Sequence, residues 1–308
     1  MQQVLLGFSV IVMVIALGWA LARTRVLGEQ GAPVLVSFVY YVALPALLLR
    51  TLLTYELSVL FSARFVIIIV SAWIIAGIMY VVHRRLWRHQ ADTAVIGLLA
   101  ASYANSSNLG IPLAAYVIGD ASLVVPLLIF QVAIYTPLAM VLLDLLHSPH
   151  GIRWRTIIQT PLRNPLFIAA IFGGVLAQLP ADIPQVLYDV IDMLADSSIP
   201  LALIVFGMSL YGAGVLRSGE YPAKQVWVTV LAKNIGHPLL AGLLAWALGL
   251  EGAALAGAVF LGALPTAQNV YTYALRHQTA TTFARDTGIV STVVSLPLLA
   301  MIAVVFGM

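Results

Sequence analysis

The sequence predicts an all-α polytopic membrane protein in which ten transmembrane helices form a 5+5 inverted repeat with broken, crossing helices 4 and 9. Three observations predict this fold. The chain is too apolar for a soluble domain, and its basic residues gather in alternate connections between apolar segments. Two of those segments also carry a polar interruption, at matching places in the two halves of the chain.

Composition places the chain in a lipid bilayer. Of its 308 residues, 62% are hydrophobic and 9% are charged, and the mean hydropathy is +1.02. Such a surface would aggregate in water, whereas it matches lipid. The absence of cysteine excludes disulfides and thiolate metal sites. The first segment has neither a charged n-region nor a small-residue cleavage site, so we expect a retained span and not a signal peptide.

Ten apolar segments each approach the roughly 20 residues that a helix needs to cross a bilayer. None alternates with a period of two, which argues against a β-barrel. The sixth is short and the seventh long, so their ends are the least certain. The predicted spans are 4–22, 33–53, 65–82, 94–118, 122–146, 164–179, 186–211, 225–248, 252–275 and 286–307.

The distribution of basic residues predicts the orientation. Twelve of the 15 Lys and Arg lie in the first, third, fifth, seventh and ninth connections. The positive-inside rule then places both termini outside a cytoplasmic (inner or plasma) membrane. The same alternation argues against a nucleic-acid partner, because the charges follow topology and form no patch. The twelve are Arg23, Arg25, Arg84, Arg85, Arg88, Arg153, Arg155, Arg163, Arg217, Lys224, Arg276 and Arg285.

Five spans per half mean that the second half enters the membrane with the opposite orientation. We therefore predict a first repeat at 1–154 and a second at 155–308. Landmarks recur in the same order: Pro45 matches Pro200, and Pro137 matches Pro297. Between them, the interruption at 105–112 matches the one at 264–269.

The first interruption, NSSNLGIP at 105–112, stands inside an apolar segment. Pro112 has no N–H, and its ring would clash with the carbonyl of Asn108, so a regular helix cannot continue. Gly110 permits backbone angles that other residues resist. Non-helical backbone at membrane depth needs protein or a water-filled cavity to satisfy it. Alone, this segment fits a binding site and a capped kink about equally.

The second interruption, LPTAQN at 264–269 with Pro265, favours a binding site. An ordinary kink has no reason to recur in the other half, whereas paired breaks are typical of inverted-repeat transporters. Half-helices beginning near Pro112 and Val270 would direct their partly positive N-terminal ends to one region, where an anion could bind without a dedicated arginine. The candidate substrate-binding residues at the breaks are Asn105, Ser106, Asn108, Gln268 and Asn269. Alternatively, they only satisfy freed backbone groups.

Two charged residues are candidates for charge compensation or ion coupling. Lys233 lies inside the eighth span, where a lysine costs about 2.5–3.5 kcal/mol and therefore needs a partner. We favour the C-terminal end of a broken helix as that partner, over a substrate carboxylate or a coupled proton. Asp196 shares a helix face with Asp189 and Asp192, which indicates either solvated acids or ion coupling.

Gln131 and Tyr135, one turn apart in the fifth span, are candidates to face the first break. Gln131 is therefore added to the substrate-binding set, although interhelical hydrogen bonds would explain both residues equally well. No cofactor and no metal site is expected. The sequence provides no acid pair in the breaks and no nucleophile with a base, so we do not expect an enzyme.

These motifs resemble the auxin efflux carrier family, which includes the plant PIN proteins and bacterial carriers assigned to malate or malonate. Asn105 stands seven residues before the Pro of Gly-Ile-Pro at 110–112, and Arg-Asn-Pro at 163–165 opens the sixth span. Lys233 precedes His-Pro at 237–238, ALPTAQN occupies 263–269, and Thr-Gly at 287–288 opens the tenth span. The long central loop of many plant members is missing, which points to the compact bacterial branch.

The resemblance implies an elevator-type carrier of a small organic anion, such as malate, malonate or an auxin-like acid. It implies a scaffold at about 1–60 and 161–215, and a moving carrier domain at about 61–150 and 222–308. Transport would be outward or ion-coupled; coupling to Na⁺ or H⁺ and a homodimer are left open. The alternative is an anion channel or a substrate-sensing receptor on the same architecture.

The predicted topology can be tested by labelling, because the chain has no cysteine of its own. Single cysteines from Gln2→Cys and Met308→Cys are expected to react with an impermeant thiol reagent added outside intact cells. A cysteine from Ser148→Cys is expected to react only after the membrane is opened. Labelling of the two termini from opposite sides would contradict the ten-span arrangement.

Overall fold

The computed structural model describes residues 2–28, 30–54, 63–147, 162–178, 184–212, 215–216 and 220–307, which are helical apart from short connections and one isolated bridge. The predicted repeat boundary at 154/155 and the basic residues Arg153, Arg155 and Arg217 lie outside this part. The α-helices are α1 (Gln2–Thr24), α2 (Gly31–Phe38), α3 (Leu44–Thr54), α4 (Ala63–Val81), α5 (Ala91–Ser102), α6 (Ile111–Leu113), α7 (Val125–Phe130), α8 (Thr136–His147), α10 (Pro165–Leu176), α11 (Gln185–Leu210), α12 (Ala223–Leu231), α13 (His237–Ala247), α14 (Gly252–Ala263), α15 (Gln268–Arg276) and α16 (Thr281–Phe306).

Within the described residues, seven π- and 3₁₀-helical pieces extend or join these helices. They are η1 (Val39–Ala43), η3 (Val82–Leu86), η4 (Ser106–Gly110), η5 (Ala114–Ile118), η6 (Ala121–Val124), η7 (Gln131–Tyr135) and η8 (Ala232–Gly236).

Within the described residues, six helices are long and apolar enough to cross a membrane. They are Gly31–Leu53, Ala63–Leu86, Ala121–Leu146, Gln185–Leu210, Ala223–Ala247 and Thr281–Phe306. Shorter apolar helices occupy Ser9–Thr24, Ala91–Ser102, Ser106–Ile118, Pro165–Leu176 and Gly252–Ala263. The all-helical, multi-pass fold class is therefore confirmed, while the ten-span inverted repeat stays a prediction.

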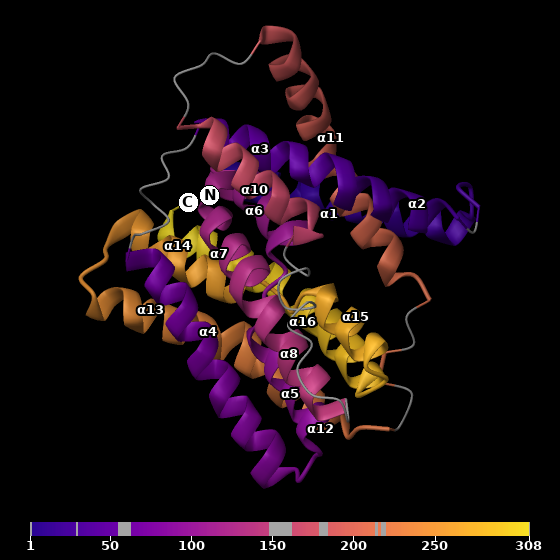
Figure 1. The fold of residues 1–308 in the computed structure, drawn as a ribbon, viewed down its shortest axis with the longest axis vertical. Coiled ribbons are helices and arrows are strands. Elements are labelled where there is room, and N and C mark those ends of the chain that lie inside the picture. Colours follow the sequence, from indigo (N-terminus) through magenta and orange to yellow (C-terminus); the bar gives the residue numbers. More distant parts are fainter. Residues whose placement is uncertain are drawn as a thin grey trace.

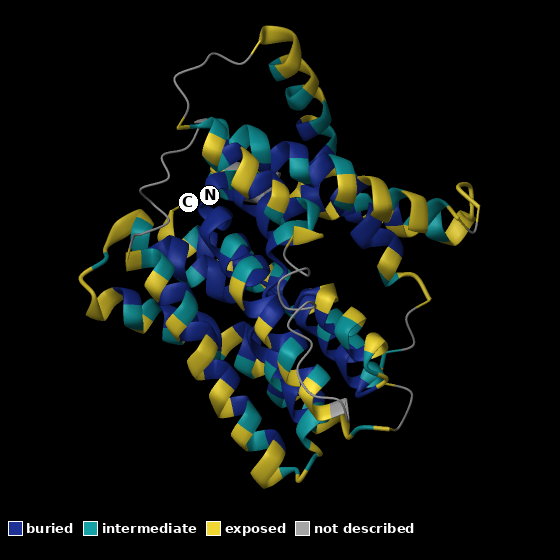
Figure 2. Ribbon diagram, in the orientation of Figure 1, coloured by how far each residue is buried: buried dark blue, intermediate teal, exposed yellow. Residues whose placement is uncertain are grey.

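Large apolar side chains cover the outside of the molecule. Trp73, Ile78 and Val175 are 48%, 53% and 54% exposed, and many others resemble them. Figure 2 shows the buried residues in the centre, where the helices cross, and exposed residues along the outward faces. This distribution suits lipid, because hydrocarbon chains are as apolar as the side chains that meet them.

The helices pack as two groups. Helices α1, α2, α3, α10 and α11 contact one another most extensively, and α4, α5 and α12 to α16 form a second set of close neighbours. In Figure 1 the first group occupies the upper part of the view, and α4, α5, α12 and α13 occupy the lower part. Smaller contacts join the two groups, among them α11 with η4 and α1 with α16.

The first group is tied together at its backbone and by ion pairs. A Cβ on Gly18 of α1 would lie 2.1 Å from the carbonyl oxygen of Ile204, so only glycine allows this approach to α11. Small residues at crossings of this kind are typical of membrane helices. Arg50 of α3 places Nη1 2.7 Å from carboxylate oxygens of both Asp192 and Asp196 of α11. Helix α11 therefore contacts both α1 and α3 closely.

Four prolines are preceded by a turn of π-helix. In each case an N–H bonds to the carbonyl five residues earlier, for example Ile111 N–H to Ser106 O just before Pro112. The wider turn removes the clash that a proline ring would otherwise make with the carbonyl four residues back. The prolines are Pro45 after η1, Pro112 after η4, Pro137 after η7 and Pro238 after η8.

Candidate functional site at the helix crossing

The two polar interruptions cross each other. Helix α5 ends at Ser102 and η4 begins at Ser106, while α14 ends at Ala263 and α15 begins at Gln268. Between these ends, Asn105 N–H donates to Pro265 O at 2.7 Å, and Ala267 N–H donates to Tyr103 O at 3.0 Å. The pair Ala104 and Thr266 forms an antiparallel bridge. Each break therefore satisfies backbone groups of the other.

The structure corrects the predicted start of the first half-helix. This half-helix begins at Ser106, earlier than the predicted start near Pro112, while the second begins at Gln268, close to the predicted start near Val270. Pro112 lies inside its half-helix, because the π turn of η4 accommodates the ring that was expected to interrupt it. Pro265 does lie in a break, where its carbonyl accepts the hydrogen bond from Asn105.

Gly110 also differs from expectation. Its φ of −60° is ordinary helical geometry, so it does not supply an unusual backbone angle. A Cβ at this position would instead lie 3.0 Å from Cδ1 of Leu264 and 3.2 Å from the carbonyl oxygen of Asn105. Gly110 therefore permits close packing at the crossing.

Side chains of η7 support the first break. Gln131 Nε2 donates to Ala104 O at 2.8 Å, and the hydroxyl of Ser106 donates to Gln131 Oε1. The hydroxyls of Tyr135 and Ser102 share a hydrogen bond at 2.5 Å. Both Gln131 and Tyr135 thus make the interhelical hydrogen bonds that were one of the two interpretations, and Gln131 also faces the break.

The second break is supported from α16, α5 and η8. Thr266 N–H donates to Ser291 Oγ at 3.0 Å, and Thr266 Oγ1 donates to Ala100 O at 2.6 Å. Ser291 Oγ in turn donates to Asn234 Oδ1 at 2.7 Å. Thr266 N–H and the carbonyl of Ala100 are therefore paired within protein, as membrane depth requires.

Lys233 is fully buried in η8 beside the end of α14. Its Nζ donates to Gly262 O at 2.8 Å and lies 3.2 Å from Nδ1 of His237. Gly262 belongs to the last turn of α14, where carbonyl groups give the helix end a partial negative charge that a cation stabilises. This is the contact that the helix-end interpretation of Lys233 requires.

A polar cavity of about 40 Å³ lies against the crossing. Five of the predicted binding residues line it: Asn105, Ser106, Asn108, Gln131 and Asn269. The side chain of Asn105 is held by a hydrogen bond from Asn108 N–H to its Oδ1, at 3.3 Å. Its Nδ2 has no hydrogen-bond partner, although Asn105 is only 2% exposed. An unpaired buried donor at a cavity is available to an acceptor that enters the cavity.

Among the other residues that line this cavity, two polar ones come from the first helix group, and the sequence did not identify them as binding residues. Asn164 caps α10 by accepting the N–H of Leu166 at 2.9 Å, and it reaches the cavity from the first helix group. The signal was present, because an Asn directly before a Pro marks the start of a helix. Tyr40 of η1 also lines the cavity, but nothing in its sequence neighbourhood distinguishes it.

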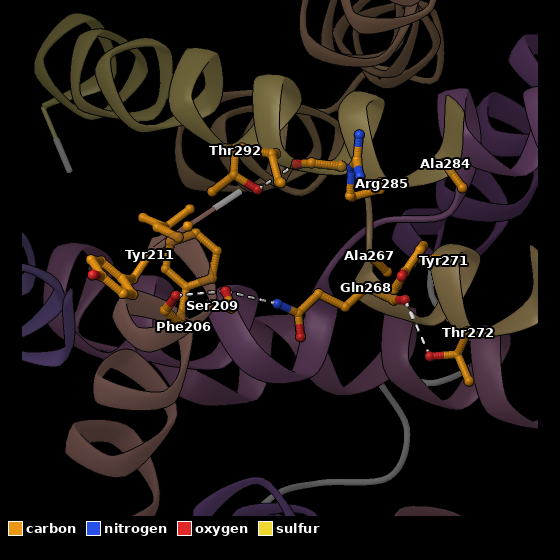
Figure 3. A pocket seen from close by; sticks show the side chains of 14 residues that line it. Phe206, Ser209, Tyr211, Ala267, Gln268, Tyr271, Thr272, Ala284, Arg285 and Thr292 are labelled. Carbon is orange, nitrogen blue, oxygen red and sulfur yellow. Dashed lines mark hydrogen bonds between the residues drawn. The ribbon is translucent and has the colours of Figure 1, made fainter. Parts of the chain in front are cut away.

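Gln268 and Asp196 do not line this cavity. Gln268 lines a separate cavity of about 410 Å³, where its Nε2 donates to Ser209 Oγ at 3.2 Å (Figure 3). Asp196 is paired with Arg50 in the first helix group, so Arg50 is its compensating charge. The side chain of Asp196 is nevertheless 69% exposed, which agrees with the solvated interpretation, while the pairing with Arg50 could not be predicted because the sequence does not show that α3 lies beside α11.

The crossing cavity combines an uncharged lining with the start of a helix at its edge. Its described lining contains no carboxylate and no basic side chain. Helix α15 begins at its edge, and Ala267 provides no side-chain cap for the first N–H groups. Uncapped N–H groups and the helix dipole favour negative charge at this position.

Removal of the Lys233 amine tests its role at the helix end. Lys233→Met is expected to lower the thermal unfolding temperature in detergent, because Gly262 O loses its partner at a cost of about 1–3 kcal/mol. Lys224→Met, at an exposed position of α12, is the control and should not change it. Carboxylate affinity should be nearly unchanged in both. A stable Lys233→Met protein that no longer binds carboxylates would contradict the helix-end role.

Comparison with known proteins identifies the family of the chain. The profile of a family described as "Membrane transport protein" matches residues 8–153 and 148–303. A protein of Rhizobium meliloti (strain 1021) named "Putative malonate transporter" is 28% identical over 267 residues, which cover 83% of this chain and 81% of that protein. The chain therefore belongs to this membrane transport protein family, the auxin efflux carrier family that its motifs resemble.

Proposed function

We propose that the protein is an elevator-type carrier that moves a small organic anion, a mono- or dicarboxylate such as malonate, across the cytoplasmic membrane. The substrate carboxylate binds at the crossing cavity. The observation that carries this proposal is the buried, unpaired amide Nδ2 of Asn105 at that cavity.

The amide of Asn105 has the properties of a donor prepared for a ligand. An unsatisfied buried donor costs about 1–3 kcal/mol, and a carboxylate oxygen would remove that cost with a charge-assisted hydrogen bond. Asn269, from the other break, lines the same cavity. The uncapped start of α15 adds a favourable field for the anion. Together these groups select negative charge without a buried arginine.

The size of the cavity supports a moving carrier. At about 40 Å³ it holds a few water molecules but no organic acid. Tyr40 and Asn164 line it from the first helix group, and Asn105 and Asn269 line it from the crossing. Displacement of the two groups relative to each other would enlarge it. We assign the predicted scaffold to the first group and the predicted carrier domain to the second, and the proposed repeat gives each group helices from both halves.

Malonate is proposed as a substrate because the name of one relative includes it. At 28% identity that name supports a substrate class, the small carboxylates, and not one compound.

A channel or receptor on this architecture is the second candidate function. Saturable counterflow in proteoliposomes distinguishes a carrier from a channel, which would give a non-saturating current. Repeating the assay with and without Na⁺, and at two pH values, identifies the coupled ion.

The binding role of Asn105 has a direct test. Asn105→Ala is expected to weaken malonate affinity about tenfold to hundredfold, because a hydrogen bond to a charged group contributes about 1.5–3 kcal/mol. Isothermal titration of the purified, monodisperse variant measures the change. Asn234→Ala is the matched control, since the Asn234 amide is already paired: its Nδ2 donates to Ser291 O, and its Oδ1 accepts from Ser291 Oγ. It should lower stability and leave affinity unchanged. Unaltered malonate affinity in Asn105→Ala would make Asn105 a structural cap only.

A further inference from the structure

The second cavity lies between the end of α11, the start of α15 and the first half of α16. Its volume is about 410 Å³, within the roughly 300–1,000 Å³ of small-molecule sites, whereas the crossing cavity measures about 40 Å³. Figure 3 shows Gln268 extending across this space toward Ser209, with Thr292 and Arg285 on the opposite wall.

The walls combine a charged and polar side with an apolar one. Arg285 lines the cavity, whereas its ion-pair partner Asp286 does not; Asp286 is 4% exposed and also accepts the N–H of Leu216. The amide of Gln268 and the hydroxyl of Ser209 add hydrogen-bonding groups. The rings of Phe206, Tyr211 and Tyr271 and the side chain of Ile289 form the apolar part. A small carboxylate with a carbon body fits this combination.

The two cavities are neighbours. Ala267 lines both of them, and the next two residues divide between them: Gln268 faces the larger cavity and Asn269 the smaller. A ligand in the larger cavity is therefore separated from the crossing by the backbone at Ala267. The predicted orientation places the end of α11, the end of α15 and the start of α16 on the cytoplasmic side.

We infer that the larger cavity is an access site, which binds the carboxylate substrate on the cytoplasmic side before it reaches the crossing. This inference rests on the proposed function. Arg285 and the amide of Gln268 hold the carboxylate, and the hydrogen bond from Gln268 to Ser209 joins the moving helices to the scaffold until the ligand displaces it.

Gly288 offers a way to fill this cavity. It lies on the lining, in regular helix, and a Cβ built on it meets no heavy atom within 4 Å. Gly288→Leu therefore places a side chain in the cavity without moving the backbone. Gly77 of α4 is a matched control, since its Cβ also meets nothing within 4 Å and it lines a groove of about 580 Å³ elsewhere, between α4, α5 and α8.

The chain has no cysteine, so protection from labelling can be measured at one introduced position. Thr272→Cys places a thiol on the cavity wall, and malonate is expected to slow its reaction with a small thiol reagent in a saturable manner. Protection should persist when Asn105→Ala is added, because the crossing site is separate. The factor by which malonate slows the thiol reaction should fall at least tenfold with Gly288→Leu and persist with Gly77→Leu. Gly288→Leu should also slow proteoliposome counterflow.

Three results would overturn the access site: no protection of Thr272→Cys by malonate, full protection in Gly288→Leu, or loss of protection on adding Asn105→Ala. The last would place the carboxylate at the crossing alone. Failure of the proposed function has a different signature, because the wild-type protein would then show no saturable counterflow with any carboxylate tested.

Discussion

The structure depends on the reciprocal backbone hydrogen bonds between the two breaks, from Asn105 to Pro265 and from Ala267 to Tyr103. In lipid an unpaired backbone group costs several kcal/mol, so a broken helix is tolerated only where protein replaces the lost bonds. Each break does this for the other. Gln131 and Thr266 pair carbonyls near the crossing, and Lys233 stabilises the end of the helix that leads to it.

One polar group at the crossing is not paired in this way. The network pairs the carbonyls that Gln131 and Thr266 contact, and it pairs the side chains of Ser106 and Gln131 with each other. It leaves Nδ2 of Asn105 without an acceptor. Satisfied groups rigidify the crossing, whereas the unsatisfied donor provides a place for a ligand. The same arrangement therefore accounts both for the stability of the broken helices and for the anion that we propose they bind.

The helical fold and the two interruptions were predictable, because apolar length, basic alternation and paired polar segments are local signals. Contacts between distant helices were not. Nothing in the sequence shows that Arg50 meets Asp196, or that Gln268 turns to Ser209 while Asn269 turns to the crossing. Pro112 was misplaced for another reason: π turns before prolines leave the helix continuous, and no residue pattern marks them.

The central claim is that one substrate anion is bound by both breaks together. A double-mutant cycle measures this directly, from the malonate affinities of the wild-type protein, Asn105→Ala, Asn269→Ala and the double variant. If both asparagines hold one ligand, the effects should depart from additivity by about 0.5–3 kcal/mol, with both single variants weakened. Two results would contradict a site shared by the two breaks: losses of binding free energy that add to within about 0.5 kcal/mol, or wild-type malonate affinity in either single variant.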